Sequence, residues 1–372
     1  MSVAESARSQ TALAPSEEIP RLMNAAVYIG NGQIAMRSIE TPVLGAGEAL
    51  VRVESCGVCH TDLKKIEYDL LPAPRVYGHE TAGVVAAVGS GVTKYRPGDR
   101  VVVFHHIPCG SCFYCDRRLY AQCDSYKRVG VTAGYEPAGG GFSQYVRVMD
   151  WIVERGMERI PEGVTFDRAC WVEPVNTCLK AVELLALLPG DVVAVLGQGP
   201  IGLIFTMLGR RAGARVFSTD TLAFRRGLAE EFGASAYDPR ESDFEHAVKA
   251  ATGGRGVDAV IVAASAAPVV DQALKISRPG AKILLFAQTS AGERIEISGA
   301  DICVRERVLL GSYSADVDLQ AESAALVFSG ELPLERLISH RLPLEEIGRA
   351  IQIAQHPAEG SLKVVVHPQE RN

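Results

Sequence analysis

Aromatic residues make up only 6% of this 372-residue chain, and two of them are tryptophan. The sequence also lacks the long uncharged apolar run that a membrane-spanning helix needs. Its basic residues are scattered, and the formal net charge is -6. Because clustered Lys and Arg are the usual mark of nucleic-acid or membrane-surface binding, we expect neither partner and predict a small-molecule partner instead.

A secretory signal has an apolar stretch behind a basic start. Residues 1–24 do not have this pattern. We expect a flexible tail there and a cytoplasmic protein. Disulfides are disfavoured, because nine cysteines are an odd number and four of them form one tight cluster. Isolated cysteines usually behave as small buried hydrophobes, which is our prediction for Cys170, Cys178 and Cys303.

The chain is long enough for two domains, and its two halves have different patterns. The first half has alternating or apolar runs between glycine and proline turns, which predicts a β-rich distorted barrel; the runs are 25–29, 50–54, 84–88 and 100–104. In the second half short apolar strands alternate with helical segments; the strands are 192–197, 214–220, 257–265 and 281–288. This alternation predicts right-handed βαβ units and a doubly wound parallel sheet, so the fold class is α/β. After about Gly311 we expect one more helical stretch and a final strand at Leu362–His367.

The cysteine cluster reads PCGSCFYCDRRLYAQC, with the spacing C-x2-C-x2-C-x7-C. Four thiolates at this spacing can surround one tetrahedral zinc and leave no open position for a substrate. We therefore predict a structural zinc site formed by Cys109, Cys112, Cys115 and Cys123.

A glycine-rich turn, VLGQGPIGLI, joins the first predicted strand of the second half to a helix. Its glycines Gly197, Gly199 and Gly202 are in G-x-G-x-x-G register, with Pro200 and Ile201 between the last two. These glycines permit a tight turn and a close approach of backbone to a pyrophosphate, which the helix N-terminus attracts. The turn therefore predicts dinucleotide binding.

The next predicted strand ends at Asp220, where a carboxylate can accept hydrogen bonds from the ribose 2′-hydroxyl. Because the same carboxylate repels the additional phosphate of NADP, we predict NAD as the cofactor. Arg225 is a candidate cofactor contact. The pair Arg225 and Arg226 would favour a phosphate, but a solvated helix face is the preferred interpretation of the two arginines.

A second set of possible metal ligands lies earlier in the chain. Cys59 stands in ESCGVCHTDL, and His79 and Glu80 follow in VYGHETAGVV. A thiolate, an imidazole and a carboxylate can hold a catalytic zinc and leave one position for water or substrate. Cys56 and Cys59 also form a C-x-x-C pair, but a redox pair of this kind belongs at a helix start in a thioredoxin-like unit. We expect Cys56 to be a core residue.

The motifs occur in a fixed order: Cys59, Gly-His-Glu, the four-cysteine loop, Glu173 and GQGPIG. In this order they resemble the zinc-containing alcohol dehydrogenases of the medium-chain dehydrogenase/reductase superfamily, from about residue 25 to the C-terminus. The resemblance implies a GroES-like catalytic domain at 25–175 and 312–372, with a zinc lobe at 105–125. It also implies an inserted Rossmann domain at 176–311, a substrate cleft between the two domains, and a homodimer or homotetramer.

The resemblance assigns roles to single residues. Cys59 and His79 match the catalytic zinc ligands, and Glu80 matches an acidic neighbour that approaches or binds the metal. Asp62 is expected to orient His79 through its other ring nitrogen. Glu173, in WVEPVNTCLKAV, stands where simple alcohol dehydrogenases carry cysteine, and its Glu-Pro resembles the sorbitol, glucose and threonine dehydrogenase branch. This hard carboxylate would bind zinc directly or through water.

A zinc ion polarises the substrate hydroxyl, and Thr61 matches the residue that passes the hydroxyl proton outward. Lys64 stands where the family often continues this relay with a histidine, so the exit of the proton is left open. His60 and Lys363 match positions that contact cofactor phosphates. The remaining histidines show no zinc-ligand spacing and are interpreted as surface or loop residues: His105, His106, His246, His340, His356 and His367. A substrate wall at His105 is an alternative, because its segment leads into the zinc lobe.

With two zinc ions and NAD, the predicted reaction moves a hydride from a secondary alcohol of a polyol, sugar, cyclitol or aminocyclitol to NAD and gives a ketone. A threonine-type amino-alcohol dehydrogenase and a biosynthetic aldehyde or ketone reductase are the enzymatic alternatives. A non-catalytic protein that binds zinc and a dinucleotide is the alternative from another class.

Overall fold

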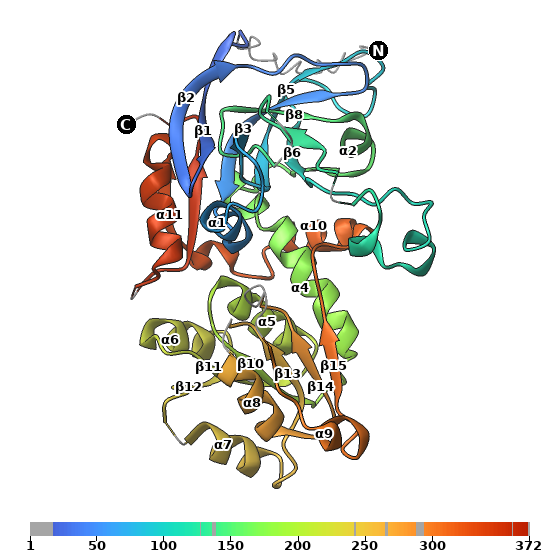
Figure 1. Ribbon diagram of the computed structural model, residues 1–372, viewed down its shortest axis with the longest axis vertical. Helices are drawn as coiled ribbons and strands as arrows, with labels where there is room; N and C mark the ends of the chain where they lie inside the picture. The colour runs from blue at the N-terminus through green and yellow to red at the C-terminus, as the bar shows by residue number, and fades with distance from the viewer. Residues whose placement is uncertain are drawn as a thin grey trace, which may run out of the picture.

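The computed structural model describes residues 18–370, except 127, 136–138, 242, 265–266, 288–293 and 359. Figure 1 shows a β-rich lobe above a lobe built on a parallel sheet. Two segments connect the lobes: α4 (Val172–Leu185) and the chain that leads from β15 (Val308–Gly311) to α10 (Gln320–Ser329).

The β-rich lobe contains two sheets around one apolar core. The small antiparallel sheet has the order β2-β1-β4, with bounds β1 (Leu22–Gly30), β2 (Gln33–Glu40) and β4 (Arg75–Val76). The large sheet has the order β16-β17-β3-β5-β6-β9, with β8 and β7 attached beside β3. Its strands are β3 (Ala49–Gly57), β5 (Glu80–Val88), β6 (Arg100–Val103), β7 (Val131–Thr132), β8 (Tyr145–Val148), β9 (Met157–Arg159), β16 (Ile338–Pro343) and β17 (Lys363–His367). Since β17 pairs with β3, the C-terminal segment returns to the β-rich lobe.

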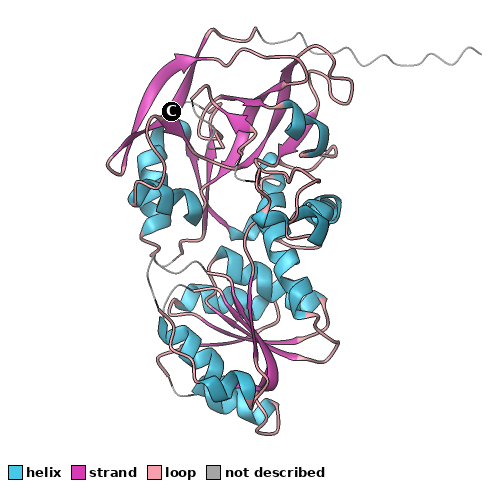
Figure 2. Ribbon diagram, turned by 45° about the vertical axis from the view of Figure 1, so that its right-hand side comes forward, coloured by secondary structure: helices cyan, strands magenta, loops and turns pink. Residues whose placement is uncertain are grey.

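The lower lobe is a six-stranded parallel sheet in the order β12-β11-β10-β13-β14-β15. Its other strands are β10 (Val192–Leu196), β11 (Arg215–Thr219), β12 (Ser235–Tyr237), β13 (Val257–Val262) and β14 (Ser277–Leu285). Helices cover both faces, as Figure 2 shows, and the covering helices are α5 (Pro200–Arg211), α6 (Ala223–Glu231), α7 (Asp243–Ala251) and α8 (Ala267–Ile276). The short helix α9 (Gly299–Cys303) has no buried residue. All five residues of β10 are buried, because a central parallel strand is covered on both faces.

The β-rich lobe also carries short helices. They are α1 (His60–Glu67), α2 (Asp150–Arg155), α3 (Phe166–Ala169) and α11 (Ile347–Gln355). In α11 the residues Ile347, Ala350 and Ile351 are buried, which is the apolar face expected of a surface helix. The described chain has no helix whose length and apolar character would let it cross a bilayer.

The predicted α/β fold class is confirmed: one lobe is a curled β structure and the other is a parallel α/β sheet. The short strands β12 and β15 were not predicted, because three and four residues give too little periodicity. Two helices, α10 and α11, follow Gly311 instead of one. The predicted tail at 1–24 is too long, since β1 begins at Leu22; residues 1–17 lie outside the described part.

One burial prediction is also wrong. Cys170 and Cys178 are buried as expected, but Cys303 is exposed at the end of α9. His105 lies in a loop, as one of the two predicted possibilities had it, but it is buried, with 8% exposed. It directly follows Phe104, and the apolar run of β6 continues into the core at this point.

Candidate active site

Cys59 and His79 meet where strands β3 and β5 pair. The antiparallel register sets Gly57 opposite Glu80, so Cys59, two residues after β3, and His79, directly before β5, lie at the same edge of the sheet. Cys59 is the N-cap of α1, and His79 immediately precedes β5. The ligand atoms of Cys59, His79 and Glu80 all lie within 4.8 Å of one another. This spacing fits one zinc ion bound at about 2.0–2.3 Å from each ligand atom.

Asp62 fixes the orientation of the His79 ring. Its Oδ1 lies 3.0 Å from His79 Nδ1, and both side chains are buried. Burial opposes the charge of each group, but their mutual attraction raises the pKa of His79 and lowers that of Asp62. With Nδ1 held by the carboxylate, Nε2 is the nitrogen left for a metal, which is the arrangement predicted from the sequence.

Glu80 forms a buried ion pair with Lys363 that was not predicted from the sequence. The Lys363 ammonium lies 2.6 Å from Glu80 Oε1, and its nitrogen lies 5.3 Å from the centre of the buried Trp171 ring. Gly57 makes room for this pair, because a Cβ at that position would lie 1.9 Å from Glu80 Oε2. Lys363 was predicted to contact a cofactor phosphate, and the structure places it beside the candidate metal ligands.

Glu173 occupies the first turn of α4 and lies outside the group of three ligand atoms. It lines a small cavity with Thr81, Phe104 and Cys170. Burial raises the pKa of Glu173 to about 7, against the attraction of His79. Its carboxyl is therefore near the site without sharing the tight spacing of Cys59, His79 and Glu80.

The first turn of α1 carries the other predicted side chains. Thr61 is half-buried two residues after Cys59, while His60 is exposed. Lys64 lies one turn further along the same helix and is half-buried. The helix thus places the predicted proton relay next to Cys59.

The glycine-rich turn has the form that a dinucleotide requires. Gly197 has a φ of +98°, and a Cβ at Gly202 would lie 1.9 Å from the Gly197 carbonyl oxygen. Helix α5 begins at Pro200 after Gly199, which makes no side-chain capping hydrogen bond. A Cβ at Gly199 would meet only Arg225, 3.8 Å away, so this side of the turn has room for a ligand at the helix N-terminus.

Asp220 lies 22 residues after Gln198, and its carboxylate binds the backbone of the glycine-rich turn. Its Oδ2 accepts a hydrogen bond of 2.7 Å from the Gln198 backbone N–H, and Oδ1 accepts one of 2.9 Å from Leu222. Arg225 Nη1 lies 3.8 Å from Asp220 Oδ2. Arg226 donates to the Asp220 carbonyl oxygen, so the prediction of a solvated face for the two arginines is wrong.

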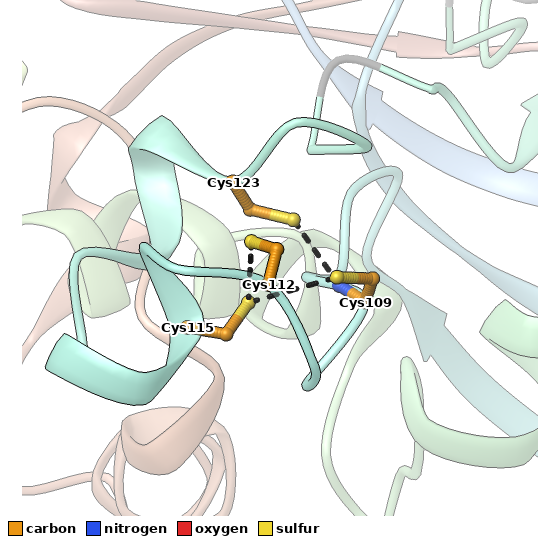
Figure 3. A group of neighbouring side chains, drawn as sticks. All are labelled: Cys109, Cys112, Cys115 and Cys123. Atoms are coloured by element: carbon orange, nitrogen blue, oxygen red, sulfur yellow. Dashed lines mark hydrogen bonds between the residues drawn. The ribbon is translucent and has the colours of Figure 1, made fainter.

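The four-cysteine lobe projects from the β-rich lobe beside α10 (Figure 1). In Figure 3 the four sulfurs converge, and their ligand atoms all lie within 4.8 Å of one another. Sulfur separations are 3.6 Å for Cys112–Cys115 and 3.9 Å for Cys109–Cys115. Hydrogen bonds, first from Ser111, lower the pKa of Cys109 to about 6, which favours the thiolate that zinc needs. The donor set fits one tetrahedral zinc.

A row of four rings, not predicted from the sequence, connects the candidate site to this lobe. Ring centroids are 4.7 Å apart for His79–His105, 4.0 Å for His105–His106 and 4.9 Å for His106–Tyr126. Tyr126 is in the core of the four-cysteine lobe. The only sequence signal was the His-His pair directly after an apolar strand.

Comparison with protein families matches two domain models. Residues 45–157 match the alcohol dehydrogenase GroES-like domain, and residues 200–328 match the zinc-binding dehydrogenase domain. The first match contains the candidate ligands Cys59, His79 and Glu80 and the four-cysteine lobe, and the second begins at the helix of the glycine-rich turn.

Whole proteins match over nearly their full length. D-Altritol 5-dehydrogenase of Agrobacterium fabrum is 31% identical over 87% of this chain and 94% of its own. Sorbitol dehydrogenase of Bacillus subtilis is 28% identical over 94% of this chain and 98% of its own. Among solved structures, one from Sinorhizobium meliloti 1021 bound to NADP is 33% identical, with a TM-score of 0.84 and coverage of 93% and 99% of the two chains.

Proposed function

Because this chain belongs to the zinc-containing alcohol dehydrogenases of the medium-chain dehydrogenase/reductase superfamily, we propose that it oxidises a secondary alcohol of a polyol or sugar to a ketone. The substrate carbon loses a hydride to a nicotinamide dinucleotide, and its hydroxyl loses a proton. Relatives named for sorbitol, D-altritol, L-galactonate and D-arabitol phosphate support this substrate class.

One observation carries the proposal: the ligand atoms of Cys59, His79 and Glu80 lie within 4.8 Å of one another, with Asp62 behind His79. These three residues would hold a catalytic zinc, which as a Lewis acid makes a substrate hydroxyl more acidic. Glu173, at the edge of the site, would act through water or as an exchanging ligand. Asp62 holds His79 in one tautomer, and this keeps its Nε2 available.

Proton transfer is assigned to Thr61. Its hydroxyl lies in the first turn of α1, next to Cys59, and can accept the substrate proton and pass it outward. Lys64 lies one turn further on, with His60 at the exposed start of the helix. Lys64 would lie where the proton leaves, and His60 would lie where a cofactor phosphate binds.

For the cofactor we propose NAD. The Asp220 carboxylate is fixed by two backbone N–H groups, which keeps a negative charge beside the position of the ribose 2′-hydroxyl. Because one structural relative was solved with bound NADP, the preference for NAD over NADP should be measured. Asp220→Asn should lower the NAD/NADP ratio of kcat/KM at least about tenfold, because it removes this charge. An unchanged ratio would contradict the assignment.

We also propose the larger organisation implied by the family. The two separate sheets support a catalytic domain at 25–175 and 312–372 and a Rossmann domain at 176–311. The sulfur geometry of the four-cysteine lobe supports a second, structural zinc there. β15 is an edge strand, and its exposed Val308 suits pairing with a second copy, as expected for a homodimer or homotetramer in the cytoplasm. Light scattering of the purified protein tests the assembly.

The main test is a screen of NADH and NADPH production with the zinc-loaded protein and a panel of polyols, sugars, cyclitols and amino alcohols. Cys59→Ser should abolish turnover, while its affinity for NADH in a fluorescence titration should stay within about twofold. Cys303→Ser is the matched control, because Cys303 is exposed and distant in sequence from the site. Retained turnover in Cys59→Ser, or no turnover of any alcohol by the wild type, would refute the proposed function.

A further inference from the structure

The glycine-rich turn contains a polar side chain, Gln198, that is completely buried. Its Nε2 donates to the Gly197 carbonyl oxygen at 3.1 Å and lies 3.4 Å from the Val195 oxygen, and its Oε1 accepts from Thr206 Oγ1 at 2.9 Å. Because a carbonyl oxygen can only accept, the amide nitrogen must face the two backbone oxygens and the amide oxygen must face the hydroxyl. The side chain therefore connects the turn to helix α5, in which Thr206 is also fully buried.

The peptide group between Gly197 and Gln198 is held on both of its sides. Its oxygen accepts the hydrogen bond from the Gln198 side chain, and its N–H donates to Asp220 Oδ2 at 2.7 Å. Because a peptide group is planar, its oxygen and its N–H turn together, and holding one of them fixes the direction of the other. The Gln198 side chain thus helps to fix the N–H that binds the Asp220 carboxylate.

The carboxylate of Asp220 has two backbone donors that set its direction. One is the Gln198 N–H, and the other is the Leu222 N–H, which lies 2.9 Å from Oδ1. Only the first of these donors depends on a side chain of the glycine-rich turn. Without the Gln198 amide, the peptide would be held by Asp220 alone, and the carboxylate and the peptide could then turn together. A change at Gln198 should therefore reach the ribose-binding carboxylate, although the Gln198 side chain itself is enclosed.

We propose that Gln198 is a positioning residue for cofactor choice: through the peptide it holds, it keeps the Asp220 carboxylate directed at a free ribose 2′-hydroxyl. A carboxylate fixed in this direction binds the hydroxyl and repels a 2′-phosphate, whereas a carboxylate that can turn away does both less well. The inference rests on the proposed function, because it explains how this chain sets a preference for NAD. Thr206 belongs to the same arrangement, since its hydroxyl fixes which end of the amide faces the turn.

The experiment measures the dissociation constants of NADH and NADPH by fluorescence titration of the zinc-loaded full-length protein. The wild type should bind NADH more tightly, and Gln198→Met, which keeps the length of the side chain without its amide, should reduce this preference at least about threefold. Thr206→Val should act in the same direction, and the double variant should lose no more than Gln198→Met alone, because both changes act through one hydrogen-bonded group. Thr206→Ser, which keeps the hydroxyl, should keep the wild-type preference.

Thr252→Val is the control variant, because its hydroxyl is also buried in the lower lobe but hydrogen-bonds at the end of α7, so it should cost stability without changing the preference. If Gln198→Met and Thr206→Val weaken both dinucleotides equally, Gln198 only supports the turn and the inference is overturned. It is also overturned if both variants keep the wild-type preference while Asp220→Asn loses it, and the NAD assignment then stands. If Gln198→Met does not fold, the two Thr206 variants decide. An unchanged preference in Asp220→Asn is a different result and refutes the NAD assignment itself.

Discussion

Lys363 and Glu80 are 283 residues apart in the sequence, yet the lysine ammonium lies 2.6 Å from Glu80 Oε1 in the interior. The exposed fractions of the two side chains are 7% and 1%. Burial opposes the charge on Lys363, but attraction to Glu80 and Cys59 raises its pKa. The C-terminal strand β17 therefore supplies the positive charge that balances the carboxylate of the candidate metal site.

Replacing Lys363 by methionine should destabilise the fold strongly. In the zinc-free protein, Glu80 would remain as an uncompensated buried charge, and breaking a buried pair in this way costs about 3–5 kcal/mol. The free energy of unfolding in urea measures the effect, and Glu80→Gln combined with Lys363→Met should recover part of it. Lys249→Met is the matched control, because the Lys249–Glu245 pair is exposed and is worth less than about 0.5 kcal/mol. Equal effects of the two lysine changes would argue against a buried pair.

Gly57→Ala tests the space around this ion pair. The new Cβ would lie 1.9 Å from Glu80 Oε2 and 2.8 Å from Lys363 Cε, and both side chains are too enclosed to move aside freely. We expect less bound zinc and a loss of kcat/KM of at least about tenfold, measured by metal analysis and steady-state kinetics. Gly227→Ala is the control, because a Cβ there meets nothing within 4 Å and the helix α6 favours alanine. Wild-type zinc content in Gly57→Ala would contradict the prediction.

Motifs with short spacing were predictable from the sequence, and contacts made across the fold were not. The four cysteines and the glycine-rich turn lie in single segments, so their spacing predicts their geometry. The residue types of Cys59, His79 and Glu80 suggested a metal site, but their roles came from the family resemblance, because the register of β3 and β5 brings these residues together. No local pattern shows that a lysine in the last strand will pair with Glu80 or that the His105 ring will pack against His79.

The four-cysteine lobe should stabilise the connection between the two lobes of the molecule. Tyr126 places its hydroxyl 2.8 Å from Ser314 Oγ, in the segment that follows β15, and Tyr120 donates to Asp318 in the same segment. Cys112→Ser should remove one zinc per chain and lower the melting temperature by several degrees, because structural zinc contributes directly to folding. Metal analysis and thermal unfolding measure both effects, with Cys303→Ser as the control. Unchanged zinc content would show that the cysteines hold no metal.

His367 should make stability depend on pH. Its Nε2 lies 2.7 Å from Asp167 Oδ1, and this hydrogen bond raises the pKa of His367, while the pKa of Asp167 is lowered despite burial. Arg341 contacts the other Asp167 oxygen at 2.6 Å, and Glu370 lies 3.0 Å from His367 Nδ1. Because the folded pKa of the histidine is raised, its contribution is complete below the ordinary value of about 6.5 and is lost as the pH rises through the folded value.

We therefore expect His367→Asn to reduce the free energy of unfolding by about 1–2 kcal/mol at pH 6, and by less at pH 9. Asp167 stays ionised across this range because its pKa is lowered, so the change reports on His367. Urea unfolding of wild type and variant at the two pH values measures the difference, in which the titration of all other groups cancels. His356→Asn, at an exposed site, should show no such pH-dependent difference. A difference between wild type and His367→Asn that grows from pH 6 to pH 9 would mean that the neutral imidazole, and not the charged pair, stabilises this part of the fold.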